Sequence, residues 1–321
     1  MPKRKLNYQP LAFGNIPEDR HYFGGTDSGL YSYMFIQDVM NHLTPYHVHS
    51  SRDNKSFKID ISNPSVEMEI RALFHMPYEY ESYYQPLSET IFSFIRSASS
   101  YLLARGGKVY FEIVDATIED KEILRPVFAL YPIHGKVIEF IRTYYQIIPK
   151  DTQDSEKKFI AIPKSKVWIL EIAKDLGKVN DIITLSNNLK ELEKASLLGS
   201  DIVLSQKNLF GFDFGKTQTL IDAKILEATS KWGWDMRMGL NNQHALEYYL
   251  YHRMLRFGYS MATLRTDMLF KMNGLLKRLG YDATISFSGI PTPEEYLNAI
   301  QMMEQRQFSF KQASDLIYFS L

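Results

Sequence analysis

The sequence predicts an α+β fold, and three observations support this class. Apolar side chains recur at helical spacing in residues 86–104, whereas residues 57–61 alternate as a strand does. Hydrophobic residues make up 45% of the 321-residue chain, enough to bury a sizeable core. No internal repeat and no low-complexity segment is visible. We therefore expect one α+β domain with a protruding pair of helices.

Residues 1–30 are polar and rich in Gly, Pro and Asp, and they include Gly24-Gly-Thr-Asp-Ser-Gly29. This composition is typical of an extended segment, so we expect an N-terminal arm. The arm either wraps a neighbouring subunit or is a loose terminus, and the sequence favours neither. No apolar run follows the basic start of the chain, and we expect no signal peptide.

The next elements follow from periodicity and from turn residues. A helix is expected over 31–43, a strand over 57–61 and a helix over 86–104, which Gly106-Gly107 ends. A strand over 108–114 comes next.

The following region is expected to be rich in strands. Residues 127–131 and 137–141 flank Pro132-Ile-His-Gly135, whose composition predicts a hairpin turn. Residues 160–170 are expected to form two short strands broken at Pro163, because proline cannot donate to a strand ladder.

The C-terminal half is expected to be mainly helical. A helix over 181–198 carries a narrow apolar stripe, and Gly199 is a plausible stop for it. A Trp/Gly/Met-rich loop then precedes a long helical run that ends at Leu279-Gly280. The other expected elements are a helix over 217–231, a strand over 283–288 and a helix over 294–306.

The charge balance limits the function classes. Lys and Arg number 37, and so do Asp and Glu, so the formal net charge is zero. A tight DNA-binding protein usually has a basic excess, because neutralising phosphates supplies most of its affinity. Neutrality thus disfavours a repressor or a nuclease and is compatible with a channel through which DNA slides. The chain has no cysteine, which excludes disulfides, thiolate metal sites and cysteine nucleophiles.

Two sets of side chains raise the possibility of metal chemistry. His47 and His49 would share one face of an extended segment, with His42 and His75 available as further ligands. Surface histidines near a turn are the commoner explanation, and we expect no bound metal and no other cofactor.

Acidic side chains define an alternative function, that of a metal-dependent enzyme acting on nucleic acid. Its candidate ligands are Asp60, Glu67 and Glu112, and Glu67 would share a face with Glu69 if residues 66–70 were extended. Solvated strand faces are the commoner explanation of these acids, and no complete ligand set can be assembled from the sequence.

Residues 211–217 contain a Gly-Lys-Thr but do not form a phosphate-binding loop. That motif requires its first glycine where Phe210 stands, and it requires a preceding apolar strand.

Several short sequence segments, and the order in which they occur, resemble those of a known protein family. The first similar segment combines a helix, a glycine turn and a strand that ends in an acidic residue, and here it is Ser100-Tyr-Leu-Leu-Ala-Arg-Gly-Gly-Lys-Val-Tyr-Phe-Glu112. The second is a small β-unit centred on a turn of proline and a hydrophobic residue, here Leu130-Tyr-Pro-Ile133. The third is a strand that leads into a short basic segment with a proline, here Ile162-Pro-Lys-Ser-Lys-Val-Trp168. The last, residues 285–315, is similar to the family's C-terminal part, in which a strand precedes an acidic helix and a polar segment. Together they resemble the portal proteins of tailed bacteriophages, the head-tail connectors that form conduits for DNA.

The resemblance implies a division of the chain. Residues 1–30 would be the arm, 31–180 a mixed α+β wing, and 181–231 two stem helices around a very small clip at 199–216. Residues 232–321 would supply the tunnel loop, a long helix and a C-terminal segment on the wing and crown side.

The resemblance also implies a function without catalytic residues. The chain would form a homo-oligomeric ring of about twelve subunits around double-stranded DNA at the capsid vertex. It would serve genome packaging, ejection and head-tail joining, with terminase, capsid and adaptor proteins as partners and no membrane. It would be found in the virion, and in the host cytoplasm during assembly. Another virion connector is a further alternative.

The resemblance assigns two sets of residues. The DNA-channel set comprises Lys231, Arg237, Asn241, Asn242, Gln243, Lys207 and Lys216. The subunit-interface set comprises Leu185, Leu189, Leu192, Tyr248, Tyr249 and His252. Trp232 and Trp234, beside Gly233, are expected to anchor the loop rather than to touch DNA.

Overall fold

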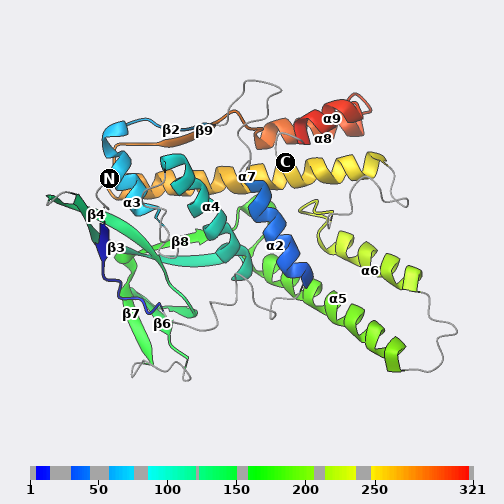
Figure 1. Ribbon diagram of the computed structural model, residues 1–321, viewed down its shortest axis with the longest axis horizontal. Helices are drawn as coiled ribbons and strands as arrows, with labels where there is room; N and C mark the ends of the chain where they lie inside the picture. Colours follow the sequence, from blue (N-terminus) through cyan, green and yellow to red (C-terminus); the bar gives the residue numbers. More distant parts are fainter. Residues whose placement is uncertain are drawn as a thin grey trace. The chain divides into compact units, whose positions relative to one another are not determined.

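A computed structural model describes residues 5–14, 30–43, 58–75, 86–120, 123–149, 158–205, 214–235 and 247–317 (Figure 1). These residues combine helices and strands, which confirms the α+β class. The chain forms two compact units, each assembled from three separate segments, rather than the one domain expected. Unit 1 comprises 1–25, 49–171 and 267–289, and unit 2 comprises 26–48, 172–266 and 290–321.

Unit 1 contains a sheet organised around one long strand. This strand, β3 (Lys108–Asp120), pairs along one side with β4 (Ile123–Pro132), and all its pairings are antiparallel. Its other side pairs with β8 (Val167–Glu171) near its start and with β1 (Lys5–Tyr8) near its end. The N-terminal strand β1 therefore pairs with the part of β3 that the shorter strand β8 does not reach.

A second sheet of unit 1 has the strand order β5 (Lys136–Glu139), β6 (Thr143–Ile147) and β7 (Phe159–Pro163). The predicted hairpin across residues 132–135 is therefore wrong, because β4 and β5 belong to different sheets. The extension of β3 beyond its predicted end supplies the partner of β4, and residues 132–135 carry the chain from one sheet to the other.

The break predicted at Pro163 is confirmed. β7 ends there, a short 3-10 turn η5 (Lys164–Lys166) follows, and β8 then joins the first sheet.

Helices cover the core of unit 1. The predicted helix is confirmed as α4 (Leu87–Ala104), whose Ile91, Phe94 and Ala98 are fully buried. Residues 66–70, considered above as an extended segment, are instead helical. The Asn63 side chain accepts a hydrogen bond from the Ser65 amide and starts the turn η3 (Pro64–Val66), which leads into α3 (Glu67–Leu73). A two-stranded sheet joins β2 (Lys58–Ile61) to β9 (Ile285–Ser288).

Unit 2 is helical. It contains α2 (Leu30–Leu43), the turn η6 (Lys174–Leu176), α5 (Val179–Ser205), α6 (Phe214–Ala228), α8 (Pro293–Glu304) and α9 (Phe310–Ile317). The long helix α7 (Glu247–Arg278) contributes its first part to unit 2 and its last part to unit 1. No helix among the described residues combines the length and apolar character needed to cross a membrane.

The predicted stop at Gly199 is wrong, because α5 continues to Ser205. One glycine inside a helix costs only about 1 kcal/mol relative to alanine, which is too little to end a long helix by itself. The expected clip at 199–216 is thereby shortened at both ends by α5 and α6. Its centre, 206–213, lies outside the described residues.

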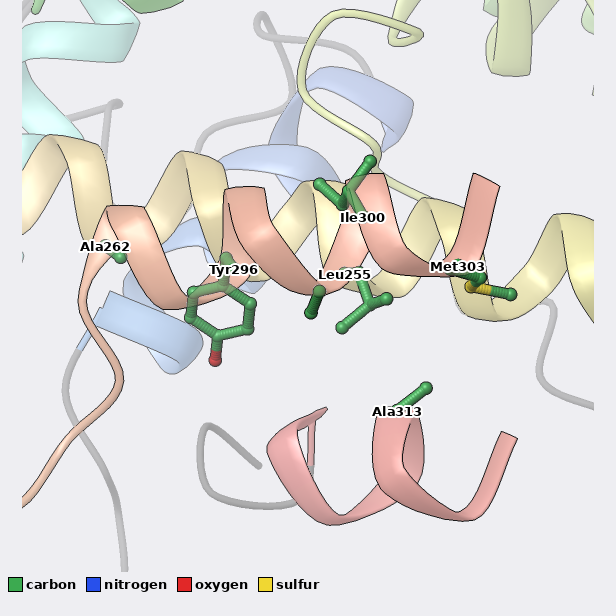
Figure 2. Packing of buried hydrophobic residues seen from close by; sticks show 7 residues of the cluster. Leu255, Ala262, Tyr296, Ile300, Met303 and Ala313 are labelled. Atoms are coloured by element: carbon green, nitrogen blue, oxygen red, sulfur yellow. The ribbon is translucent and has the colours of Figure 1, made fainter. Parts of the chain in front are cut away.

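Helices α7, α8 and α9 of unit 2 share an apolar cluster (Figure 2). Tyr296 of α8 packs so closely on Gly258 of α7 that a Cβ atom there would lie 2.3 Å from the tyrosine ring. Helix α8 begins with a capping box between Thr292 and Glu295, which satisfies two of its first amides. The cluster consists of Leu255, Ala262, Tyr296, Ala299, Ile300, Met303 and Ala313.

Candidate functional site

The candidate site is the turn of unit 2 that joins α6 to the predicted tunnel loop. Trp232 is 2% exposed and Trp234 is 1% exposed, and the ring of Phe35 in α2 meets both indoles edge-on. The Trp234 indole Nε1 donates to Asp38 Oδ2 at 2.8 Å. The two tryptophans therefore anchor the start of the loop, which confirms the interpretation made from the sequence.

Arg253 of α7 fastens this turn, although it was absent from the sequence-based candidates. Its guanidinium, in a residue only 5% exposed, donates to the Leu226 and Trp234 carbonyls and to the Thr229 hydroxyl. The Tyr249 hydroxyl is a further acceptor at 3.3 Å. One side chain near the start of α7 thus binds the end of α6 and the beginning of the loop, so the loop has a fixed base.

Gly233 allows the turn to approach the α7 backbone. Its φ is 76°, and an added Cβ atom would lie 2.5 Å from the Phe257 amide nitrogen and 2.6 Å from the Arg253 carbonyl oxygen. Only glycine fits this position without displacing the main chain.

The predicted channel residues are described only in part. Lys231 is exposed, and its carbonyl accepts a hydrogen bond from Arg256 Nε at 3.1 Å. Lys216 lies in α6, and nothing is described of its side chain. The other channel candidates lie outside the described residues: Arg237, Asn241, Asn242, Gln243 and Lys207.

The leucine stripe of α5 packs inside the chain. Leu185 is 7% exposed and Leu189 is fully buried, while Leu192 is half-buried. In this conformation Leu185 and Leu189 have almost no surface to offer a neighbouring subunit. Both side chains belong to the core of unit 2, because α2 and α6 pack against α5, and this burial does not favour the predicted interface role.

The other interface candidates remain accessible at the start of α7. Tyr248 is 42% exposed and Tyr249 is 41% exposed. His252 stacks on Tyr248 with ring centroids 6.1 Å apart, and its Nε2 lies 3.2 Å from Glu304 Oε1. Two exposed aromatic side chains on one helix end are suited to packing against another protein surface.

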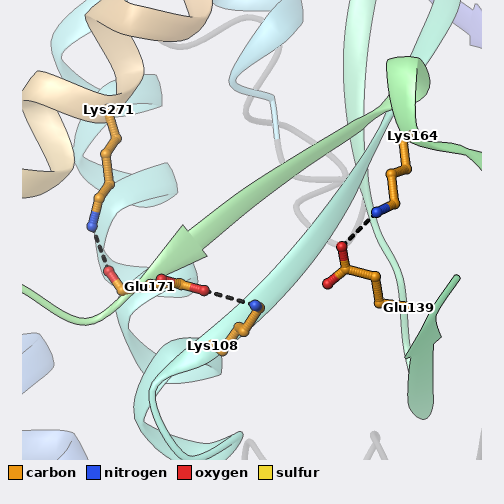
Figure 3. A network of polar contacts seen from close by, with 5 residues as sticks. All are labelled: Lys108, Glu139, Lys164, Glu171 and Lys271. Atoms are coloured by element: carbon orange, nitrogen blue, oxygen red, sulfur yellow. Dashed lines mark hydrogen bonds and ion pairs between the residues drawn. The ribbon is translucent and has the colours of Figure 1, made fainter. Parts of the chain in front are cut away.

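Unit 1 contains a network of ion pairs that the sequence did not reveal (Figure 3). Lys108 Nζ lies 2.7 Å from Glu171 Oε1, and Lys164 Nζ lies 2.5 Å from Glu139 Oε1. Lys271 of α7 donates to the Glu171 carbonyl. Burial would lower the pKa of Lys108, but the hydrogen bond and charge of Glu171 raise it. The pairs tie β3 to β8 and β5 to the turn η5, which is a structural role.

A small cavity of unit 1 lies beside this network. Its volume is about 220 Å³, below the roughly 300–1,000 Å³ usual for small-molecule sites. Arg105 on its wall donates to the Gly135 carbonyl at 2.5 Å. Its lining includes Tyr101, Arg105, Lys108, Tyr110, Ile133 and Val137.

The three acids of the alternative enzyme function are not gathered into one site. Asp60 lies on β2 and Glu67 starts α3. Glu112 lies on β3, is 2% exposed and accepts hydrogen bonds from the amides of Leu11 and Ala12. Burial raises the pKa of the Glu112 carboxyl, although both amides lower it. Within the described part of the chain, no group of three or more potential ligands could hold a metal ion.

The histidines do not form a site within the described residues either. His47 and His49 lie outside them. His42 Nδ1 lies 2.6 Å from the Asp38 carbonyl oxygen in its own helix, and its ring packs edge-on against Phe257.

His75 leads to a prediction of pH dependence. Burial lowers its pKa from 6.5 to about 4. The unfolded chain then binds this proton more tightly, so the stability contribution is fully present above pH 6.5 and is lost progressively as the pH falls from 6.5 to about 4. We expect a loss of up to about 3 kcal/mol from this group. Urea unfolding of the wild type and of His75→Gln across this range measures it, and identical pH dependence in both proteins would contradict it.

The Gly-Lys-Thr of residues 215–217 lies in the first turn of α6. The described element before it is the helix α5 rather than a strand, so the exclusion of a phosphate-binding loop stands.

The sequence and the structure were compared with known proteins. No protein-family model, curated protein or solved structure matches this chain.

Proposed function

We propose that this chain is the subunit of a portal-type ring, a closed assembly of about twelve copies through which double-stranded DNA passes. In this role it joins a phage head to its tail and works with terminase, capsid and adaptor proteins. It is a virion component assembled in the host cytoplasm, and it performs no catalysis.

One observation carries the proposal: two packed helices lead through an anchored turn into a long helix, then a strand and a further helix. α6 runs back alongside α5 within unit 2 (Figure 1), and the Trp232-Gly-Trp234 turn follows. α7, β9 and α8 then come in the order that the portal resemblance implies.

The fixed base of the loop supports a mechanical role. Trp234, at the start of the loop, and Arg253, in the helix after it, are joined by a hydrogen bond. A turn fixed in this way gives the predicted tunnel loop a rigid start. Lys231 beside it would give one positive charge per subunit, and ring symmetry repeats this charge around the DNA.

Electron microscopy of the purified protein, with native mass measurement, tests the proposal. We expect closed rings with a central hole about as wide as duplex DNA. A monomer at high protein concentration would rule out the portal role.

A pair of variants tests the interface. Tyr248→Asp places an unpaired charge at the exposed end of α7, where we expect subunits to meet. A buried unpaired charge costs roughly 2 kcal/mol or more at each interface, so rings should dissociate. Gln301→Asp adds the same charge to an exposed position of α8 and should leave rings intact. Rings that survive Tyr248→Asp would remove Tyr248 from the interface.

A further inference from the structure

The N-terminal arm is held on unit 1 mainly through its own main chain. Residues 5–8 form β1, which pairs with 116–119 of β3. Beyond it, the amides of Leu11 and Ala12 donate to the two carboxylate oxygens of Glu112 at 3.1 and 2.8 Å. The Phe13 amide donates to Gln146 Oε1 at 2.7 Å, and Gln146 Nε2 donates back to the Phe13 carbonyl at 2.8 Å.

The surface beneath the arm offers a strand edge and two buried polar side chains as hydrogen-bond partners for a peptide main chain. We call it the arm receptor, and it consists of residues 116–119 of β3 with the side chains of Glu112, Gln146 and Tyr131. Glu112 is 2% exposed and Gln146 is fully buried. Both are polar groups in the interior of unit 1, and without the arm the described partners of the Glu112 carboxylate and of Gln146 Oε1 would be lost. A buried polar group left unpaired is costly, so the receptor needs an occupant.

The side chains of the arm give the contact its specificity. Ala12 is buried in the cluster that contains Ile133 and Tyr144. Tyr8 packs against the cluster around Ile118, and its ring lies 6.2 Å from that of Tyr131. Gly14 passes so close to Tyr131 that an added Cβ atom would lie 1.6 Å from the phenol oxygen.

We propose that in the assembled protein the arm of one copy occupies the arm receptor of a neighbouring copy. This inference rests on the proposed ring, which places an equivalent receptor beside every arm. The hydrogen bonds described for the arm join residues 5–14 to the rest of unit 1, so an arm from a second copy can make the same hydrogen bonds as the chain's own arm. Exchange of identical segments is a common, low-cost route to linking subunits.

The chain beyond the arm makes this exchange feasible. After Gly14 the next described residue is Leu30, at the start of α2 in unit 2, so the arm is not continuous with the next segment of unit 1. The residues between them can reach about 50 Å when fully extended. Covalent connection therefore does not require the arm to dock on its own chain.

Because the chain has no cysteine, a cross-link can be placed without background. Asn7 and Thr117 are opposite partners in the β1–β3 ladder, where paired Cα atoms lie about 4.5–5.5 Å apart, within the range of a disulfide. The full chain with Asn7→Cys and Thr117→Cys is oxidised with diamide and run on a denaturing gel. In the control, Asn7→Cys is combined with Ser286→Cys, an exposed position on β9.

We expect a ladder of covalent oligomers from the 7/117 variant and monomer from the control. Gly14→Val in the 7/117 background should reduce the cross-linked fraction about tenfold, because the arm no longer fits against Tyr131. Electron microscopy of the same samples reports ring formation independently.

The outcomes separate the two proposals. Rings with disulfides only inside each chain would overturn arm exchange and leave the portal role intact. Covalent oligomers without rings would support arm exchange and overturn the portal role. Monomers with internal disulfides would overturn both.

Discussion

Replacing Arg253 by methionine should destabilise unit 2 by about 3–5 kcal/mol, the largest effect expected of a single substitution here. Methionine keeps an unbranched apolar stem but removes every donor to the Leu226 and Trp234 carbonyls and to the Thr229 hydroxyl. These acceptors lie at the junction of α6 and the loop, so the loop base should loosen together with the fold. Urea unfolding followed by tryptophan fluorescence measures both, because Trp232 and Trp234 occupy this turn.

Arg256→Met is the matched control for this substitution. Arg256 lies on the same helix, but it is only half-buried, and its described hydrogen bond is a single one to the Lys231 carbonyl. We expect a cost of about 1 kcal/mol or less. Equal losses in the two variants would show that Arg253 stabilises the turn no more than the half-buried Arg256 does.

Gly233→Ala should cost about 2–4 kcal/mol. The new methyl group must fit between the turn and the α7 main chain, where 2.5 Å separates it from the Phe257 amide nitrogen. Backbone atoms cannot rotate away as a side chain can, and the positive φ adds a further penalty for alanine. Thermal and urea unfolding measure the loss, and retained stability would mean that the turn can move away from α7.

Gly274→Ala is the control for the glycine substitution. It also lies on α7, and a Cβ atom there meets nothing within 4 Å. Alanine in a helix interior is favoured over glycine by up to about 1 kcal/mol, so this variant should be as stable as the wild type or more stable. Comparing the stability of Gly233→Ala with that of Gly274→Ala shows whether a loss comes from close packing at Gly233 or from any methyl group added to the protein.

The local elements of the fold were largely predictable from the sequence. Helix α4 and the long helix α7 follow directly from apolar spacing, and the break at Pro163 follows from the missing amide hydrogen. The partner of β4 was predicted wrongly. Proline and glycine in residues 132–135 signal a change of direction, but the sequence does not say which strand the chain pairs with next.

The candidate site was predictable only in part. Trp232 and Trp234 were recognised as anchors because large aromatic side chains beside a glycine are typical of a packed turn. Arg253 could have been found as an arginine three positions after Leu250, on the same face of α7 as that buried leucine. Glu112 stands in an apolar strand, which signals a buried partner. That partner is the main chain of Leu11 and Ala12, about a hundred residues earlier, and local patterns carry no information on it.

The interleaving of the two units has a consequence for biosynthesis. Unit 1 takes its last segment from 267–289 and unit 2 takes its last from 290–321. A ribosome releases the chain from its N-terminus, so unit 1 lacks a part until residue 289 has been translated, and unit 2 lacks one until its segment from residue 290 onward has been made. A chain whose domains follow one another can fold its N-terminal domain while the remainder is being made. Here β3, β4 and α5 must wait for α7, β9 and α8, which leaves a long nascent chain for chaperones to protect.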